Sequence, residues 1–154
     1  MDLDEIPVRP GCRDAAADIQ ASIQTVHAHI DSMVEEGIPP GKIVVGGFSQ
    51  GGCMSLISTL TYPQTLAGGV VLSGWGALQS QYGEIIKPAN KQTPLLWGHG
   101  GDDPTVLTAC QTEGVKVLKE AGCNVQSETY AGVGHSSSPQ EIERVKQFIS
   151  GVLS

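Results

Sequence analysis

The chain has 154 residues, of which 40% are hydrophobic and 16% are charged. This length and composition predict a single soluble globular domain that spans residues 1–154. The formal net charge is −7, and the sequence contains no run of lysines or arginines. This acidic balance argues against nucleic acid or an anionic membrane as a main partner, because both are bound through basic patches.

The first residues predict no targeting signal. Met1 to Glu5 is acidic where a secretory signal would be basic, and no apolar segment approaches the length of a membrane span. We therefore expect a cytoplasmic protein without an integral membrane segment. Pro7 and Pro10 lie in a first ten residues without sustained periodicity, which predicts an extended arm.

A first amphipathic helix is predicted from about Arg13 onward. Its apolar residues recur at helical spacing and form one stripe: Ile19, Ile23, Val26, Ile30, Met33 and Val34. Gly37, followed by two prolines, ends the helix. His27 and His29 lie mostly off the stripe, so we expect them to be surface residues rather than ligands.

Residues 42–52 join a β-branched run to a serine flanked by glycines. The run 42–46 is typical of a strand that is buried on both faces of a parallel sheet, and a helix to about Leu60 follows. Between them, residues 47–51 read G-x-S-x-G. We interpret this as a nucleophile elbow, in which glycines two residues to either side of Ser49 remove Cβ atoms that would clash. A lone G-x-S-x-G also arises by chance, but the strand before it and the helix after it favour the catalytic interpretation.

Three further strands and two further helices follow the elbow. The strands are predicted at Gly69–Ser73, Pro94–His99 and Asn124–Tyr130, and the helices at about Leu107–Ala121 and from Ser138 to about Val152. The segment from Gly74 to about Gln92 is predicted as an irregular loop. This alternation predicts an α/β fold with a mainly parallel sheet of about four strands flanked by helices. Functional residues of such sheets gather at the carboxyl ends of the strands.

The four cysteines are widely spaced and form no C-x-x-C pair: Cys12, Cys53, Cys110 and Cys123. Their spacing indicates neither a zinc site nor a redox pair. We expect free, largely buried thiols.

A serine hydroxyl needs a base to take its proton, and the base needs a third group to orient it. The elbow implies the chain order nucleophile, acid, histidine, and His135, between the fourth strand and the last helix, is the histidine that fits. His99 precedes the acid, so we expect it to bond the loop beneath it. The acid is Asp102 or Asp103, at the end of the third strand. Both aspartates could also merely shape a turn before Pro104.

Three ordered motifs resemble one enzyme family. They are Gly46 to Gly52, His99-Gly100 followed by Asp103-Pro104 and Val106, and Gly134-His135-Ser136. Together they look like the acyl-protein thioesterase and small carboxylesterase (phospholipase/carboxylesterase) family of α/β-hydrolases, and the likeness runs from about Leu3 to the last helix. The resemblance implies a three-layer α/β-hydrolase-like fold and a serine hydrolase that cleaves carboxylic esters or thioesters through an acyl-serine intermediate.

The resemblance also implies roles for individual residues. Ser49 is the nucleophile, His135 is the base, and Asp103 is the acid, because the family's acid immediately precedes a proline. The backbone N–H of Gln50 is one oxyanion donor, and Trp75 is a wall of the acyl pocket. The implied partner is an ester or acylated substrate, with no metal and no cofactor.

The chain departs from the family at its start. Members of the family carry a further N-terminal portion with several strands and a loop that supplies the second oxyanion N–H, and nothing upstream of Gly11 corresponds to it. We therefore expect an N-terminally shortened hydrolase; the alternative is a non-catalytic or weakly active remnant that acts as a binding or scaffold protein. The shortening would leave Ile43–Val45 at an unprotected sheet edge. We expect a homodimer through this edge, or residues 1–10 folded back across it.

Overall fold

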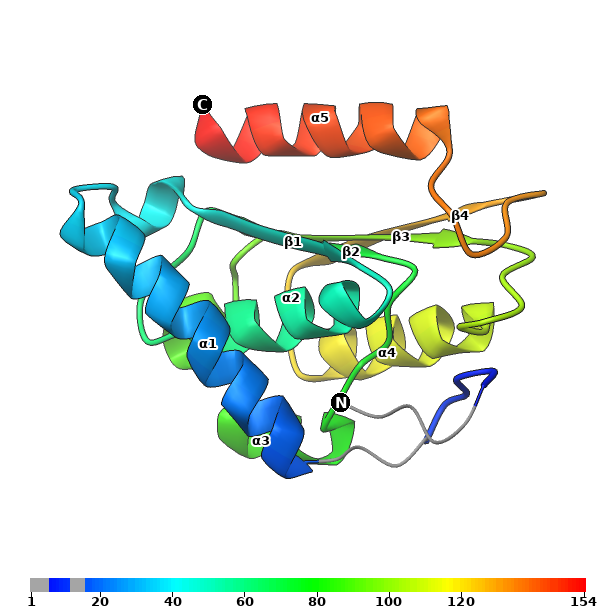
Figure 1. The fold of residues 1–154 in the computed structure, drawn as a ribbon, viewed down its shortest axis with the longest axis horizontal. Coiled ribbons are helices and arrows are strands. Elements are labelled where there is room, and N and C mark those ends of the chain that lie inside the picture. The colour runs from blue at the N-terminus through cyan, green and yellow to red at the C-terminus, as the bar shows by residue number, and fades with distance from the viewer. Residues whose placement is uncertain (1–5, 12–15) are drawn as a thin grey trace.

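The computed structural model describes residues 6–11 and 16–154 and places a four-stranded sheet between two layers of helices (Figure 1). The strands are β1 (Val44–Phe48), β2 (Gly68–Leu72), β3 (Leu95–Gly100) and β4 (Val125–Tyr130). The helices are α1 (Ala16–Glu35), α2 (Gln50–Thr61), α3 (Tyr82–Ile85), α4 (Thr108–Glu120) and α5 (Pro139–Leu153). α5 covers one face of the sheet, and α1, α2 and α4 lie on the other.

The sheet has the strand order β1-β2-β3-β4, and every pair of neighbours is parallel. A helix separates each strand from the next, so the chain returns to the same end of the sheet before each new strand begins. The expected fold, about four parallel strands flanked by helices, is confirmed. The carboxyl ends of all four strands therefore lie at the same end of the sheet. The turn after β1 and the loops after β3 and β4, described below, lie there.

Three apolar clusters of the described residues hold the layers together, and one of them joins α1 to the start of β1 and the end of α2 through Ile30, Ile43, Tyr62 and Leu66. The largest cluster lies between the sheet and α1, α2 and α4, and another lies beneath α5 around Val70, Leu96 and Phe148. Helix α2 is buried almost all round, and its polar Ser55 is satisfied because its hydroxyl donates to the carbonyls of Val45 and Val70. This packing fixes the start of α2, and with it the position of Ser49.

Several predicted boundaries differ from the structure. β1 begins at Val44 rather than Lys42, because Pro40–Lys42 forms a 3-10 turn closed by a hydrogen bond from the Ile43 amide to the Pro40 carbonyl. β1 is only half-buried, so the prediction that both of its faces are buried is wrong; β2 and β3 fit that description. The predicted loop up to Gln92 contains α3 and two 3-10 turns, Gln79–Gln81 and Pro88–Asn90.

The N-terminal arm lies beside the loop after β3. Val8 is 1% exposed and forms a parallel bridge with Val106. Its N–H donates to the Thr105 carbonyl (2.7 Å), and its carbonyl accepts from the Leu107 N–H (3.0 Å). For residues 6–11, the expectation that the arm crosses the Ile43–Val45 edge is therefore wrong. The other predicted arm residues, together with Cys12 and the predicted helix start at Arg13, lie outside the described residues.

The remaining three cysteines, Cys53, Cys110 and Cys123, are buried, and none forms a disulfide within the described part of the chain, as expected. The histidines of α1 divide. His29 is exposed, but His27 is half-buried, and its Nε2 lies 2.9 Å from the Ser58 carbonyl on α2. The prediction that His27 is a surface residue is therefore wrong, because the pairing of α1 with α2 covers it.

Candidate active site

Ser49 is the single residue between the end of β1 and the start of α2. Its φ is 56° and its ψ is −121°, a conformation that costs free energy for a residue with a Cβ atom. Its amide donates to the Leu72 carbonyl of β2 (2.7 Å). The sharp turn thus places the serine at the carboxyl end of the parallel strands, with its side chain half-buried.

The glycines around Ser49 do not contribute equally. A Cβ atom on Gly47 would lie 2.1 Å from the carbonyl oxygen of Gly51, which no side chain tolerates. A Cβ atom on Gly52 would lie 3.0 Å from the carbonyl oxygens of Gly47 and Leu72, whereas one on Gly51 would meet nothing within 4 Å. The steric requirement therefore falls on Gly47 and Gly52, and the expectation that Gly51 is needed for the same reason is wrong.

His135 reaches Ser49 from the loop between β4 and α5. Its Nε2 lies 2.9 Å from the Ser49 hydroxyl oxygen, and its side chain is 20% exposed. The loop approaches the end of β3 closely, since a Cβ atom on Gly100 would lie 2.3 Å from the Gly134 carbonyl oxygen. The ring of Phe48 packs against the imidazole, with 4.9 Å between the ring centroids. This contact was not predicted from the sequence.

Asp103 holds the other side of the His135 ring. Its Oδ2 lies 2.8 Å from His135 Nδ1, and its Oδ1 accepts from the backbone amides of Thr105 (2.8 Å) and Val106 (2.9 Å). Burial opposes ionisation of this carboxyl group, but the hydrogen bonds from His135 and the two amides outweigh it and hold the pKa of Asp103 below its ordinary value. The group is therefore a buried carboxylate at neutral pH.

Asp102 faces a different part of the same loop. Its Oδ2 accepts from the amide of Gly132 (2.7 Å), and its own amide donates to the Val133 carbonyl. It shapes the approach of the loop to β3, whereas Asp103 contacts the imidazole. Of the two aspartates that the spacing left open, the structure brings Asp103 together with His135 and Ser49.

His99 lies in β3 and does not join this chain of contacts by a hydrogen bond. Its ring is 0% exposed, and its Nε2 lies 2.8 Å from the carbonyl oxygen of Val106. The expectation that His99 bonds the loop beneath its strand is confirmed.

Comparison with known proteins places this chain in a family. The model of the Phospholipase/Carboxylesterase family matches residues 4–153. The chain belongs to this family. A rice (Oryza sativa subsp. japonica) relative named "Probable carboxylesterase" is 40% identical over 99% of this chain, and the carboxylesterase SOBER1 of Arabidopsis thaliana is 38% identical over 97%. The chain spans 58% and 65% of the length of these two relatives.

Solved structures of the family show the same fold. The crystal structure of Arabidopsis thaliana SOBER1 matches 99% of this chain with a TM-score of 0.95 at 37% identity, and the chain covers 73% of that structure. Zea mays acyl-protein thioesterase 2 matches 96% with a TM-score of 0.80 at 26% identity, and 70% of it is covered. The predicted resemblance and the α/β-hydrolase-like fold are therefore confirmed.

The two remaining residues implied by the family resemblance lie near the elbow. Gln50 is the first residue of α2, so its backbone N–H lies at the positive end of the helix dipole, directly after Ser49. Trp75 follows β2 and is 5% exposed. The segment before it is pressed against α2, since a Cβ atom on Gly74 would lie 2.9 Å from the Cys53 amide nitrogen.

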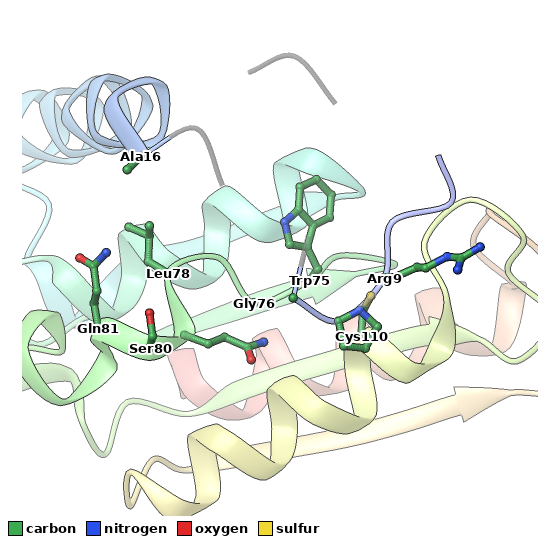
Figure 2. A pocket seen from close by; sticks show the side chains of 11 residues that line it. Arg9, Ala16, Trp75, Gly76, Leu78, Ser80, Gln81 and Cys110 are labelled. Carbon is green, nitrogen blue, oxygen red and sulfur yellow. The ribbon is translucent and has the colours of Figure 1, made fainter. Parts of the chain in front are cut away.

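Trp75 borders a cavity of about 360 Å³ (Figure 2). Side chains from the arm, the loop after β2 and the first turn of α4 surround it, including Arg9, Leu78, Gln79 and Cys110. Ser49, Asp103 and His135 are not among its lining residues. That Trp75 is a wall of the acyl pocket stays a prediction for this member of the phospholipase/carboxylesterase family.

Within residues 6–11 and 16–154, no group of three or more His, Cys, Asp or Glu side chains is arranged to hold a metal ion. In the same part of the chain, no helix combines the length and apolar character that crossing a bilayer requires.

Proposed function

We propose that this protein hydrolyses carboxylic esters or thioesters through an acyl-serine intermediate. The observation that carries the proposal is the unbroken contact from the Ser49 hydroxyl through both nitrogens of His135 to Asp103, at 2.9 and 2.8 Å. This is the geometry by which a serine is activated as a nucleophile. The names of the relatives, carboxylesterase and acyl-protein thioesterase, support esters and thioesters as the substrates.

In the proposed mechanism, the Ser49 oxygen attacks the substrate carbonyl while His135 Nε2 takes the hydroxyl proton. His135 then carries a positive charge, which the ionised Asp103 stabilises through the Nδ1–H. The imidazolium gives its proton to the departing alcohol or thiol, which leaves the acyl group on Ser49. A water molecule, deprotonated by the same imidazole, hydrolyses the acyl-serine and restores the free enzyme.

The oxyanion of each tetrahedral intermediate develops beside Ser49. The backbone N–H of Gln50 is our proposed donor to it, because it follows the nucleophile and lies at the amino end of α2. A donor and a helix dipole directed at the developing charge stabilise the transition state more than the ground state. We assign Trp75 to the wall that contacts the acyl chain.

The test is steady-state hydrolysis of p-nitrophenyl esters and acyl thioesters graded by chain length. We expect saturable hydrolysis that Ser49→Ala and His135→Ala abolish, without a change in far-UV circular dichroism. Retention of most activity in Ser49→Ala would overturn the proposed function. Absence of turnover by the wild type across the whole panel would favour a binding or scaffold protein instead.

A further inference from the structure

His99 is a buried histidine next to the carboxylate of the proposed triad. Its Nε2 lies 2.8 Å from the Val106 carbonyl oxygen and 3.6 Å from Asp103 Oδ2. Among the described residues, its buried Nδ1 has no hydrogen-bond partner. Because both acceptors face Nε2, the ring proton lies on Nε2 and is donated to Val106. Burial lowers the pKa of His99 below its ordinary value, so the ring is neutral at pH 7.

Val106 connects this ring to Asp103. The Val106 carbonyl accepts from His99, and the Val106 amide donates to Asp103 Oδ1 at 2.9 Å. The amide of Thr105 donates to the same oxygen at 2.8 Å. Val106 is 0% exposed, so its carbonyl has no water to replace a lost donor. Without the Nε2–H, the buried Val106 carbonyl would shift toward another donor, and the shift would pass through the Val106 Cα to the adjoining Val106 amide that holds Asp103 Oδ1.

We propose that His99 is a positioning residue, which fixes the Asp103 carboxylate through Val106 so that Oδ2 meets His135 Nδ1 at 2.8 Å. This inference rests on the proposed function, because Asp103 matters only if His135 acts as a base. The Nε2–H also lies near Oδ2 and adds a favourable dipole to the ionised form of Asp103. His99 itself neither receives nor gives a proton during the reaction.

The course of the loop does not depend on His99 alone. Val8 of the arm binds it from another side, through the Thr105 carbonyl and the Leu107 amide. Loss of the His99 donor should therefore leave the loop folded while displacing Val106 and the Asp103 carboxylate by a small distance. This separates a positioning role from a general contribution to stability.

The test compares amide replacements that place a donor differently. The side-chain nitrogen of His99→Gln reaches the position of Nε2, whereas that of His99→Asn falls near Nδ1, and His99→Leu has no donor. We expect kcat for a p-nitrophenyl ester to fall about 10²-fold in His99→Asn and His99→Leu with little change in KM, because a small displacement of a catalytic group has effects of this size. His99→Gln should recover most of the loss.

A destabilised control distinguishes positioning from packing. Leu118→Ala truncates a fully buried side chain on α4 and should lower Tm while leaving kcat unchanged. A second readout is independent of turnover: the downfield proton resonance of the His135 Nδ1–H that is bonded to Asp103, assigned by its loss in Asp103→Asn. This resonance should persist in the wild type, His99→Gln and Leu118→Ala, and disappear in His99→Asn and His99→Leu.

Each outcome decides the proposal. Wild-type kcat and an intact resonance in His99→Asn would overturn the positioning role while leaving the proposed function in place. A wild type without hydrolysis would overturn the proposed function, and the resonance would still show whether His99 holds Asp103. If His99→Leu fails to fold, the comparison of His99→Gln with His99→Asn carries the test, and equal values for these two would contradict the proposal.

Discussion

Replacing Asp103 by asparagine should change which nitrogen of His135 carries the proton. The Asp103 Oδ1 accepts from two backbone amides, those of Thr105 and Val106. In Asp103→Asn, the amide oxygen must occupy this position, because an NH₂ group there would face two donors. The NH₂ group is then directed at His135 Nδ1, which can only accept. The imidazole proton moves to Nε2, and that nitrogen can no longer take the proton of Ser49.

The magnitude follows from the loss of the base with the geometry kept. A wrong tautomer of this kind lowers kcat by about 10⁴-fold in a serine protease, and we expect a fall of about 10³- to 10⁴-fold here. KM should change little, because no substrate contact is removed. Asp102→Asn is the matched control: its carboxylate accepts from the Gly132 amide at the surface, which the asparagine oxygen can replace, so kcat should stay within about threefold.

The assay is initial-rate hydrolysis of a p-nitrophenyl ester by both variants, with far-UV circular dichroism to show that each is folded. A folded Asp103→Asn with kcat within about tenfold of the wild type would refute the assignment of Asp103 as the orienting acid. A larger loss in Asp102→Asn than in Asp103→Asn would refute it as well, because the ranking of the two aspartates would be reversed.

Three further predictions concern stability and assembly. Gly47→Ala should lower the free energy of unfolding in urea by about 3 kcal/mol through overpacking against Gly51, and Gly51→Ala should change it by no more than about 1 kcal/mol. Burial raises the pKa of Glu141 above its ordinary value of 4.5, so the folded protein binds this proton more tightly than the unfolded chain, and stability is lost as the pH rises through the folded pKa. Glu141→Gln should therefore stabilise the protein at about pH 8 but not at about pH 4. Equal effects at both pH values would contradict this. Among the described residues β1 pairs only with β2, and we propose that a second copy of this chain pairs with the other side of β1. Sedimentation at low micromolar concentration should show a dimer that Gly46→Lys dissociates. A wild-type monomer would disprove this pairing.

Local sequence signals were enough to predict most of the fold. Periodic apolar residues located α1, and short apolar runs beside glycine or proline located β2 and β3, because the sheet buries both faces of these strands. The start of β1 was misplaced because a 3-10 turn at Pro40–Lys42 continues directly into the strand. The short helices after β2 carry too little periodicity to be distinguished from a loop.

The site was predictable only as far as single elements determine it. Ser49 follows from the strand, glycine and helix around it, and His135 from its place after β4. The choice between Asp102 and Asp103 could not be made from their spacing, because adjacent residues of one turn point to different partners, and the partner of Asp102 is the Gly132 amide in a loop distant in sequence. The packing of Phe48 on the His135 ring depends on that same loop.

The most direct test of the central claim, that Ser49 is an activated nucleophile, is the site of covalent modification by a fluorophosphonate. This reagent phosphonylates a serine only when a neighbouring base activates it. Peptide mass spectrometry of the labelled protein should place one adduct on Ser49, and labelling should be lost in His135→Ala, in which the serine remains but the base is gone. An unlabelled Ser49 in the folded wild type, or equal labelling of the wild type and His135→Ala, would contradict the account.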